Sequence, residues 1–266
     1  MIHPTAVVEG GVIMGRDVQV GPFAYIAEGA MIGDACVLGP HVTVLGSATL
    51  GNGCRVHAGA VIGDAPQDLA FKPDTRSYVR IGAGCVIREG VTIHRGTKPE
   101  TLTEVGDGCF LMANSHLAHN VRLGRNVILA NGALLAGYVD VGERAFISGN
   151  TVVHQFVRIG RLAMLGGAAG FSKDVPPFCM TRSGWLNRVV GLNVVGLQRS
   201  GMPPEVRLQM KQAFAMLYRS GLNVAQAVER MKTAFPDGPA RELWEFVEAS
   251  KRGICGTGRA ADESEL

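Results

Sequence analysis

Aromatic side chains and long apolar runs are both scarce in this 266-residue chain. Phe, Trp and Tyr make up 6% of the residues, whereas glycine occurs 36 times. A conventional globular core relies on large aromatic side chains, so we expect an interior built from aliphatic residues instead. No apolar run approaches the roughly 20 residues that cross a bilayer, and no secretion signal opens the sequence. We therefore expect no integral membrane segment.

The six cysteines include no Cys-x-x-Cys pair, which removes the commonest sequence signature of zinc and thiol–disulfide sites. Cys36, Cys54, Cys85 and Cys109 instead occupy equivalent positions of a repeat, where we expect them to be buried as small apolar fillers. Free thiols of this kind indicate a reducing compartment, and a cytoplasmic location fits best.

The net charge of +3 is distributed unevenly. Between Phe156 and Pro203 there are six lysines and arginines but a single acid, Asp174. This stretch is either a solvated basic surface or a site for phosphates or for an acidic protein partner. Because no aromatic-rich or helix-turn-helix pattern accompanies it, nucleic acid is not an expected partner.

What the chain does contain is a period of six. Apolar residues recur at that spacing through the first two thirds of the sequence, and a small or β-branched residue follows most of them four positions later. The first run consists of Ile2, Val8, Met14, Val20, Ile26, Ile32, Leu38, Val44, Leu50, Val56 and Ile62. The repeat resumes at Ile81 and again at Val105, and it continues to Leu165.

A period of six fits neither an α-helix nor an alternating strand, and it is the signature of a hexapeptide β-helix. We therefore predict a mainly β fold with a left-handed parallel β-helix over residues 1–177. Three hexads, about 18 residues, would form one triangular coil, so that residues 18 apart stack on neighbouring coils about 4.8 Å apart. Glycines that follow aliphatic residues, such as Gly15 and Gly33, are expected at corners where a Cβ would be hindered.

The period fades after Leu165, and Asp174-Val175-Pro176-Pro177 is expected to end the β-helix because proline cannot donate to a ladder. A small α-helical domain is predicted over 178–255, with helices over about 204–219, from a cap at Asn223 to about 235, and over about 239–250. The polar residues 256–266 are expected to form a disordered tail. Two interruptions, near 64–80 and 96–104, are predicted to be loops inserted into the coils, the first of them a binding loop.

Histidines are the candidate catalytic groups. His119, Gly137 and Gln155 are spaced one coil apart, so we expect them to stack in one outer column with His154 beside it. His116 neighbours an inward-pointing leucine and should therefore point outward, to solvent or to a subunit boundary. A neutral imidazole could remove a proton from a hydroxyl or an amine, and a glycine N–H could stabilise an oxyanion. No Ser or Cys is placed as a nucleophile, so the pattern favours direct acyl transfer.

Beyond the spacing of the hexads, the chain carries a distinctive set of short segments. They are Ile2-His3-Pro4-Thr5-Ala6, Gln67-Asp68-Leu69, Val91-Thr92-Ile93-His94-Arg95-Gly96-Thr97, His116-Leu117-Ala118-His119, Leu129-Ala130-Asn131, Leu135-Ala136-Gly137, Val153-His154-Gln155-Phe156, Asp174-Val175-Pro176-Pro177, Gly191-Leu192-Asn193 and Tyr218-Arg219-Ser220-Gly221. This combination, which extends over almost the whole chain, resembles the UDP-N-acetylglucosamine O-acyltransferases of lipid A biosynthesis.

The resemblance implies a bacterial cytoplasmic homotrimer with active sites between neighbouring subunits. Such an enzyme transfers a 3-hydroxyacyl group from acyl carrier protein to the glucosamine 3-position of UDP-N-acetylglucosamine, the first step of lipid A biosynthesis. No cofactor is implied, because the acyl group arrives on the phosphopantetheine arm of the carrier. The basic stretch between Arg158 and Arg199 suits both a pyrophosphate and an acidic carrier protein.

The resemblance also implies roles for individual residues. His119 would be the general base, Gly137 the oxyanion donor, and Gly167 the position that measures acyl length. The substrate-binding residues implied in this way are Gln67, Asp68, His116, His154, Gln155, Asn193 and Arg199. No metal ligand is implied.

Four positions depart from the family pattern. Asn120 follows the implied base where the best-known members carry Asp, and an amide can orient an imidazole but cannot raise its basicity as a carboxylate does. Ala70 stands where a lysine is expected, Tyr138 where a histidine is common, and Val195 where a glutamate often contacts the ribose. These changes leave open a 3-amino sugar as acceptor, which would give an amide product.

Other functions also stay open. A hexapeptide-repeat carbonic anhydrase would bind zinc, with His116, His119 and His154 as possible ligands, although the column position at 137 holds no histidine. The N-acyltransferase of the same pathway has a further N-terminal domain before its coils, which this sequence lacks. A non-catalytic scaffold would need no ordered column of His, Gly and Gln.

Overall fold

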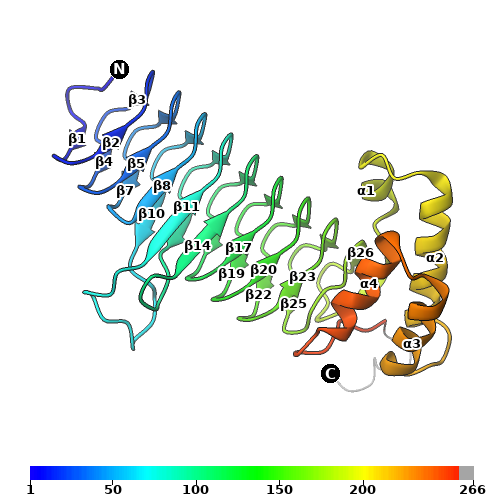
Figure 1. Ribbon diagram of the computed structural model, residues 1–266. Coiled ribbons are helices and arrows are strands. Elements are labelled where there is room, and N and C mark those ends of the chain that lie inside the picture. The colour runs from blue at the N-terminus through cyan, green and yellow to red at the C-terminus, as the bar shows by residue number, and fades with distance from the viewer. Residues whose placement is uncertain (258–266) are drawn as a thin grey trace.

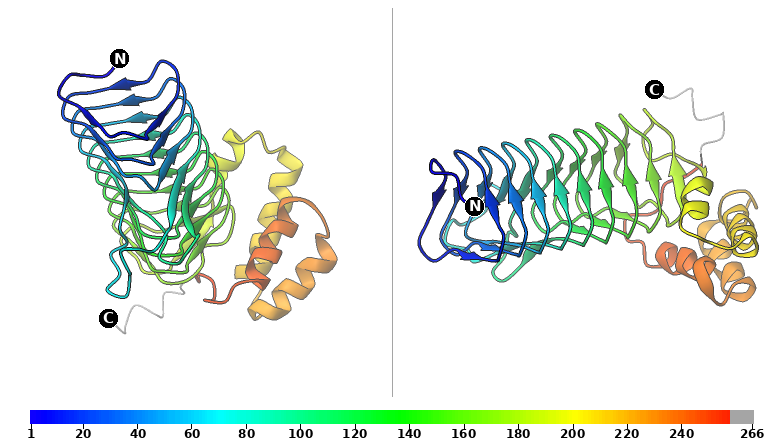
Figure 2. Two further views of the ribbon diagram at one scale, coloured as in Figure 1. Left: turned by 60° about the vertical axis from the view of Figure 1, so that its left-hand side comes forward. Right: turned by 90° about the horizontal axis from the view of Figure 1, so that it is seen from above.

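The computed structural model describes residues 1–257 and consists of a three-sided column of short parallel strands with helices at its C-terminal end (Figure 1). Each side of the column is one sheet, and the chain visits the three sheets in turn. Seen from above, the strands advance in regular steps from the N-terminus towards the helices (Figure 2). The predicted fold class, a left-handed parallel β-helix followed by a small helical region, is confirmed.

The strands are very short, and the three strands of one coil belong to three different sheets. The first sheet contains β1 (Val7–Val8), β4 (Tyr25–Ile26), β7 (Thr43–Val44), β10 (Val61–Asp64), β13 (Thr92–His94), β16 (His116–Leu117), β19 (Leu134–Leu135), β22 (Val152–Val153) and β25 (Gly170–Phe171). The second contains β2 (Ile13–Met14), β5 (Met31–Ile32), β8 (Ala48–Leu50), β11 (Tyr78–Ile81), β14 (Leu102–Val105), β17 (Arg122–Leu123), β20 (Asp140–Val141) and β23 (Arg158–Ile159). The third contains β3 (Gln19–Val20), β6 (Val37–Leu38), β9 (Arg55–Val56), β12 (Val86–Ile87), β15 (Phe110–Leu111), β18 (Ile128–Leu129), β21 (Phe146–Ile147), β24 (Met164–Leu165), β26 (Cys179–Thr181) and β27 (Val189–Leu192).

The register follows the sequence period. Val7 pairs with Tyr25 and Leu117 with Leu135, so paired residues lie 18 apart. The large aliphatic residue of each hexad points into the column, where Ile26 and Leu117 have no exposed surface. The interior is therefore a stack of aliphatic side chains, as the scarcity of aromatics indicates.

The small-residue position of each hexad is buried as well. Cys36, Cys54, Cys85 and Cys109 are free thiols with at most 1% of their surface exposed. Their S–H groups donate to glycine carbonyls, for example from Cys36 to Gly51 at 3.2 Å. The prediction that these cysteines are buried fillers is confirmed.

The glycines that follow aliphatic residues are needed because the coils stack closely. A Cβ on Gly33 would lie 2.7 Å from the Asn52 nitrogen and 2.7 Å from the Gly51 carbonyl carbon of the next coil. The left-handed backbone at the corners falls mostly on other residues, such as Asn114 (φ 57°) and Asn150 (φ 53°), because asparagine tolerates that conformation better than most residues do. Glycine is therefore required at position 33 because the backbone of the next coil lies so close, and not because the position needs a left-handed φ.

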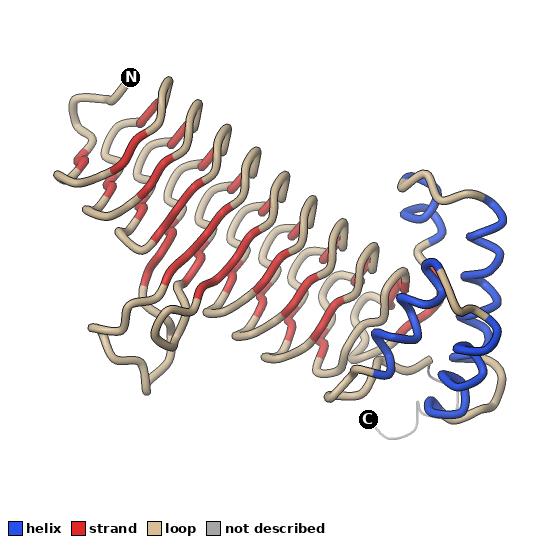
Figure 3. Tube along the Cα trace, viewed as in Figure 1, coloured by secondary structure: helices blue, strands red, loops and turns tan. Residues whose placement is uncertain are grey.

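Both predicted insertions leave the column at the same edge, between the first and second sheets. Val61 of β10 pairs with Thr92 of β13, a separation of 31 residues, which is 13 more than one coil. Arg80 of β11 pairs with Glu104 of β14, a separation of 24, which is six more. The extra residues form loops over 65–77 and 95–101, which project from the column (Figure 3). Because pairing resumes in register after each loop, the coils themselves are undisturbed.

Parallel pairing continues past the prolines that were expected to end it. Met180 of β26 pairs with Met164 of β24. Pro177 and Phe178 (φ 67°) occupy a corner turn that is closed by the Cys179 N–H donating to the Pro176 carbonyl at 3.3 Å. Proline is suited to the first central position of such a turn, where it is not required to donate to the ladder. The chain then adds β27 antiparallel to β26.

Four helices follow in the described part of the chain: α1 (Val194–Arg199), α2 (Pro204–Tyr218), α3 (Val224–Ala234) and α4 (Gly238–Glu248). The last three are those predicted from the sequence, and the short α1 was missed. Asn223 caps α3 as expected, in a reciprocal capping box with Gln226.

The chain then returns to the column. Asp174, which is 1% exposed, accepts hydrogen bonds from the Arg158 N–H and the Ser250 hydroxyl, and Ile254 bridges to it. Gly256, the first residue of the expected tail, bonds to β27 through the Val189 N–H. Residues 258–266 lie outside the described part of the chain.

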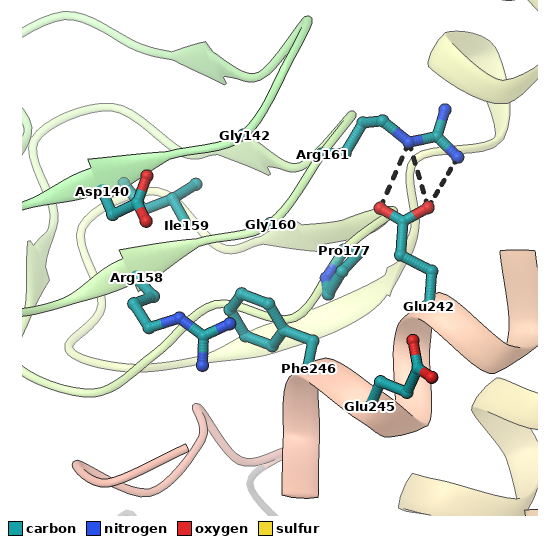
Figure 4. A pocket seen from close by; sticks show the side chains of 10 residues that line it. All are labelled: Asp140, Gly142, Arg158, Ile159, Gly160, Arg161, Pro177, Glu242, Glu245 and Phe246. Carbon is teal, nitrogen blue, oxygen red and sulfur yellow. Dashed lines mark hydrogen bonds and ion pairs between the residues drawn. The ribbon is translucent and has the colours of Figure 1, made fainter. Parts of the chain in front are cut away.

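Helix α4 is also joined to the last coils by side chains (Figure 4). Arg161 forms a two-pronged ion pair with Glu242, with contacts of 2.8 to 3.1 Å. The guanidinium of Arg158 lies over the Phe246 ring at 4.2 Å. A cavity of about 350 Å³ lies between these residues. Because Arg158 and Arg161 both contact α4, we regard this cavity as part of the packing between the coils and the helices.

The inward ladder predicts unequal effects of two neighbouring substitutions in β5. Ile32 is 3% exposed and Met31 is 43% exposed. Ile32→Ala should lower the free energy of unfolding by about 2–5 kcal/mol, because it leaves a cavity between stacked coils. Met31→Ala should lower the free energy of unfolding by less than half as much. Chemical denaturation of both variants measures the difference. Equal losses would contradict the inward ladder.

Candidate active site

Most of the candidate residues lie at the edge that carries the two insertions, which we call the insertion edge. It comprises the links from the first sheet to the second: loops 65–77 and 95–101 and the corners over 118–121, 136–139 and 154–157. Arg95 joins the two loops, since its guanidinium donates to the Thr75 carbonyl at 2.9 Å and lies over the Phe71 ring. The edge is therefore a continuous surface assembled from five successive coils.

His119 and Gly137 lie in direct contact on this edge, as the column predicts. A Cβ on Gly137 would lie 2.6 Å from Nε2 and 3.0 Å from Nδ1 of the His119 imidazole. No side chain fits at that separation, so glycine is required for the ring to rest on the backbone of the next coil. Among residues 1–257, no acceptor is hydrogen-bonded to the Gly137 N–H. That donor is available to a ligand beside the imidazole.

The Asn120 side chain contacts the His119 imidazole. Its side-chain oxygen lies 3.1 Å from Nδ1 of His119. Asn120 is 8% exposed and has a left-handed backbone (φ 60°), and its own N–H donates to Thr103 at 2.8 Å. The amide therefore orients the ring without bringing a negative charge into the site.

His116 projects from the outer face of β16 beside the insertion edge, which agrees with its predicted outward direction. Its Nδ1 forms a 2.7 Å hydrogen bond with the Thr92 hydroxyl, and its ring meets His94 edge-on at 4.9 Å. Burial and the neighbouring His94 lower the pKa of His116 to about 4. His94 is 6% exposed, and burial lowers its pKa as well. Both rings are thus neutral at physiological pH.

The remaining candidates on this edge are exposed. Gln155 and His154 lie one coil beyond Gly137, and His154 Nδ1 is 3.2 Å from the Gln155 carbonyl oxygen. Gln67 and Asp68 lie in loop 65–77, where Asp68 accepts the Ala70 N–H at 2.9 Å. Six of the predicted residues, together with His116 beside them, therefore share one edge or its border.

The other three predicted residues lie elsewhere in the chain, one at another edge of the column and two at helix α1. Gly167 is at the corner between β24 and β25, which joins the third sheet to the first. Asn193 caps α1 and donates to the Leu162 carbonyl at 2.9 Å, and Arg199 is exposed at the end of that helix. One chain alone does not bring these three residues to His119.

A groove of about 720 Å³ runs along the insertion edge towards the C-terminal segment. Asn120, Tyr138 and Phe156 are among its lining residues. Its charged lining residues are of both signs: Arg122, Arg158, Lys251 and Arg252 beside Glu100, Asp140 and Asp174.

The described residues contain no group of three or more His, Cys, Asp or Glu side chains arranged to hold a metal ion. The histidines of the zinc alternative, His116, His119 and His154, are among the residues searched. No helix in the same part of the chain is long and apolar enough to cross a membrane.

Comparison with known proteins identifies the family. A model described as Udp N-acetylglucosamine O-acyltransferase, Domain 2, matches residues 174–255, and one for bacterial transferase hexapeptide repeats matches residues 29–64 and 103–137. An acyl-[acyl-carrier-protein]–UDP-N-acetylglucosamine O-acyltransferase of Paraburkholderia phymatum is 43% identical over 259 residues, covering 95% of this chain and 98% of the relative. The chain belongs to this O-acyltransferase family. A relative with the same name from Campylobacter concisus is 37% identical over 256 residues, covering 95% of this chain and 96% of its own.

Solved structures of O-acyltransferase family members agree along the whole chain. The UDP-N-acetylglucosamine acyltransferase of Francisella novicida superposes with a TM-score of 0.94 at 35% identity, covering 98% of this chain and 96% of that one. The enzyme from Campylobacter jejuni gives 0.91 at 35% identity, covering 97% and 100%. Coils and helices therefore both belong to the architecture of this acyltransferase family.

Three residues near His119 were not among the predicted site residues: His94, Thr97 and Tyr138. Thr97 bonds to Asn120 and to Tyr138, and Tyr138 meets the His119 ring edge-on at 5.3 Å. The period could have placed Tyr138, because it lies 18 residues after Asn120. His94 directly precedes an insertion and Thr97 lies within it, so counting by 18 does not locate their neighbours.

Gly137→Ala should displace the His119 ring, because the added methyl group and the imidazole cannot occupy the same space. We expect the His119 imidazole resonances to shift while the far-ultraviolet circular dichroism stays unchanged. Gly10→Ala is the matched control, since Gly10 lies in a corner on the same edge and a Cβ there meets nothing within 4 Å. Unchanged His119 resonances in Gly137→Ala would contradict the contact.

The lowered pKa of His116 predicts loss of stability in mild acid. The unfolded chain takes up a proton near pH 6.5, whereas folded His116 does so only at about 4. Between these values the unfolded chain binds more protons, so stability falls as the pH decreases from 6.5 towards 4. His116→Gln should reduce that slope, measured by denaturation at a series of pH values. An equal slope in both proteins would show that His116 titrates alike in the two states.

Proposed function

We propose that this protein transfers a 3-hydroxyacyl group from acyl carrier protein to the 3-position of UDP-N-acetylglucosamine, the first step of lipid A biosynthesis. The observation that carries the proposal is the His119 imidazole resting on Gly137, within a chain related over 95% of its length to enzymes named for this reaction. The relatives' names specify the donor class and the sugar nucleotide. The position acylated and the 3-hydroxy group of the donor come from the family resemblance.

In this mechanism His119 is the general base. Its unprotonated ring nitrogen takes the proton of the sugar hydroxyl while the hydroxyl oxygen attacks the thioester carbonyl carbon. The negative charge that develops on the carbonyl oxygen is stabilised by the buried Gly137 N–H, in a place where few water dipoles compete. The carbon–sulfur bond then breaks, and the phosphopantetheine thiolate takes the proton back from the imidazolium. No covalent enzyme intermediate is formed.

The active enzyme would be a homotrimer. Asn193 and Arg199 at helix α1, and Gly167 at another edge of the column, lie away from the insertion edge in one chain. They can serve the same substrate as His119 only if another copy presents them. In a threefold assembly each insertion edge faces a different edge of its neighbour. Gln67, Asp68, His116, His154 and Gln155 would then bind substrate from one side of the cleft.

The donor and the location follow from the same proposal. The acyl group is carried by the phosphopantetheine arm of acyl carrier protein, so the enzyme needs no cofactor of its own. Exposed arginines such as Arg199 offer the acidic carrier a complementary surface. Since both substrates are intracellular metabolites, the enzyme would act in the bacterial cytoplasm.

The acceptor atom and the acyl length are the open choices. A neutral site with Asn120 and Tyr138 in place of the usual acidic residue and histidine is compatible with a 3-amino sugar, whose amine is a stronger nucleophile than a hydroxyl. Gly167 places no side chain at the proposed ruler position. A groove bounded by Gly167 would accept longer chains than one bounded by a bulky residue.

The deciding experiment incubates the purified protein with 3-hydroxyacyl carrier proteins of graded length and with either UDP-N-acetylglucosamine or its 3-amino analogue. We expect transfer to at least one sugar, unaffected by a metal chelator. His119→Ala should reduce kcat by about 10²–10⁴-fold, the usual contribution of a general base. The exposed His3→Ala should leave the rate unchanged.

No transfer to either sugar would refute the proposed activity. Near-normal kcat in His119→Ala would refute its role as base alone. Loss of activity on chelation would favour the zinc alternative.

A further inference from the structure

The side-chain oxygen of Asn120 is surrounded by three potential donors. It lies 3.1 Å from the backbone N–H of Thr97, 3.1 Å from the Thr97 hydroxyl and 3.1 Å from His119 Nδ1. Thr97 belongs to loop 95–101, the shorter insertion, so a loop from the preceding coil reaches the residue beside the imidazole. Asn120 is 8% exposed, and water therefore competes little for its oxygen.

This arrangement fixes which way the amide faces. A backbone N–H can only donate, so the atom opposite Thr97 must be the amide oxygen and not the amide nitrogen. An amide oxygen can only accept, so the hydrogen bond to His119 requires a proton on Nδ1. In the neutral imidazole the other nitrogen, Nε2, is then without a proton and free to act as a base.

Tyr138 extends the same network by one step. Its hydroxyl lies 3.1 Å from the Thr97 hydroxyl. Because the Thr97 hydrogen is directed at Asn120, the Tyr138 hydroxyl must donate to Thr97. The Tyr138 ring is held between two others: it stacks on Phe156 at 4.9 Å and meets His119 edge-on at 5.3 Å.

The loop that presents Thr97 is itself well anchored. The Lys98 N–H and carbonyl both bond to the Thr101 hydroxyl, at 3.2 and 2.8 Å. The Glu100 N–H donates to the Arg76 carbonyl of the longer insertion at 2.8 Å. Thr97 is therefore held at a defined position against the next coil.

We propose that Thr97 is a positioning residue: through Asn120 it selects the His119 tautomer that carries its proton on Nδ1, and Tyr138 completes the network. The inference deepens the proposed function, since the chosen tautomer matters for catalysis only if His119 is the base. It gives loop 95–101 a role at the reacting centre without contact to substrate. It also explains how this site can fix the His119 tautomer with an amide. A carboxylate at the same position would fix that tautomer by its negative charge.

The test compares Thr97→Val, which removes the hydroxyl and keeps the shape, with Thr97→Ser, which keeps the hydroxyl. The tautomer is read from the two ring ¹⁵N resonances of His119 in histidine-labelled protein, assigned with His119→Gln. Wild type and Thr97→Ser should show a protonated Nδ1 and a bare Nε2. Thr97→Val keeps the backbone N–H as a donor to Asn120 and loses the hydroxyl, so the amide is held by one of its two Thr97 hydrogen bonds. A minor population protonated on Nε2 should therefore appear, with a kcat lower by up to about tenfold, the equivalent of one hydrogen bond, and KM for both substrates unchanged.

Tyr138→Phe keeps the stacked rings and removes only the terminal donor, so a smaller loss of about two- to threefold is expected. A wild-type ring protonated on Nε2 would overturn the inference, and so would a Thr97→Val ring identical to that of wild type. Thr97→Ser as impaired as Thr97→Val would assign the effect to shape and overturn it too. A shifted tautomer with unchanged kcat would uphold Thr97 as positioning residue and refute His119 as the base.

Discussion

The close stacking of one coil on the next is the constraint on which the rest of the structure depends. Pairing at a separation of 18 residues leaves so little room at the corners that Gly33 cannot carry a Cβ. The same lack of room brings the His119 ring onto the backbone of Gly137. The contact between His119 and Gly137, which is proposed to perform catalysis, therefore resembles the contact between stacked coils at Gly33. The difference is that an imidazole takes the place of a backbone group.

Within residues 1–257, the polar groups around this contact include no charged group hydrogen-bonded to the imidazole. His94 and His116 are neutral because burial disfavours their protonated forms, and Asn120 supplies an acceptor without a negative charge. A neutral surrounding gives up the electrostatic support that a carboxylate offers to an imidazolium. The site relies instead on geometry. The backbone N–H of Thr97 fixes which way the Asn120 amide faces, and the hydrogen bond from His119 to that amide fixes the orientation of the ring.

Much of the fold could be predicted because the period is a local property of the sequence. The ladder, the buried cysteines and the contact of His119 with Gly137 follow from counting residues, and the three longer helices follow from their caps and apolar patterning. The short α1 has too little pattern to be seen, and Pro176-Pro177 was misread because proline is unfavourable in a ladder but favourable in a corner turn. Thr97 could not be placed from sequence, because its distance from Asn120 depends on how six inserted residues fold.

The two loops of the insertion edge have a consequence for how such a protein can diverge. Each leaves and re-enters the column at the same corner, so lengthening, shortening or rewriting it leaves the register of every coil unchanged. Residues proposed to bind the substrate can therefore vary in number as well as in kind while His119 and Gly137 stay where they are. Selection can therefore act on substrate preference and on scaffold stability almost separately. Thr97 is the residue through which the variable loop contacts Asn120, beside the fixed His119.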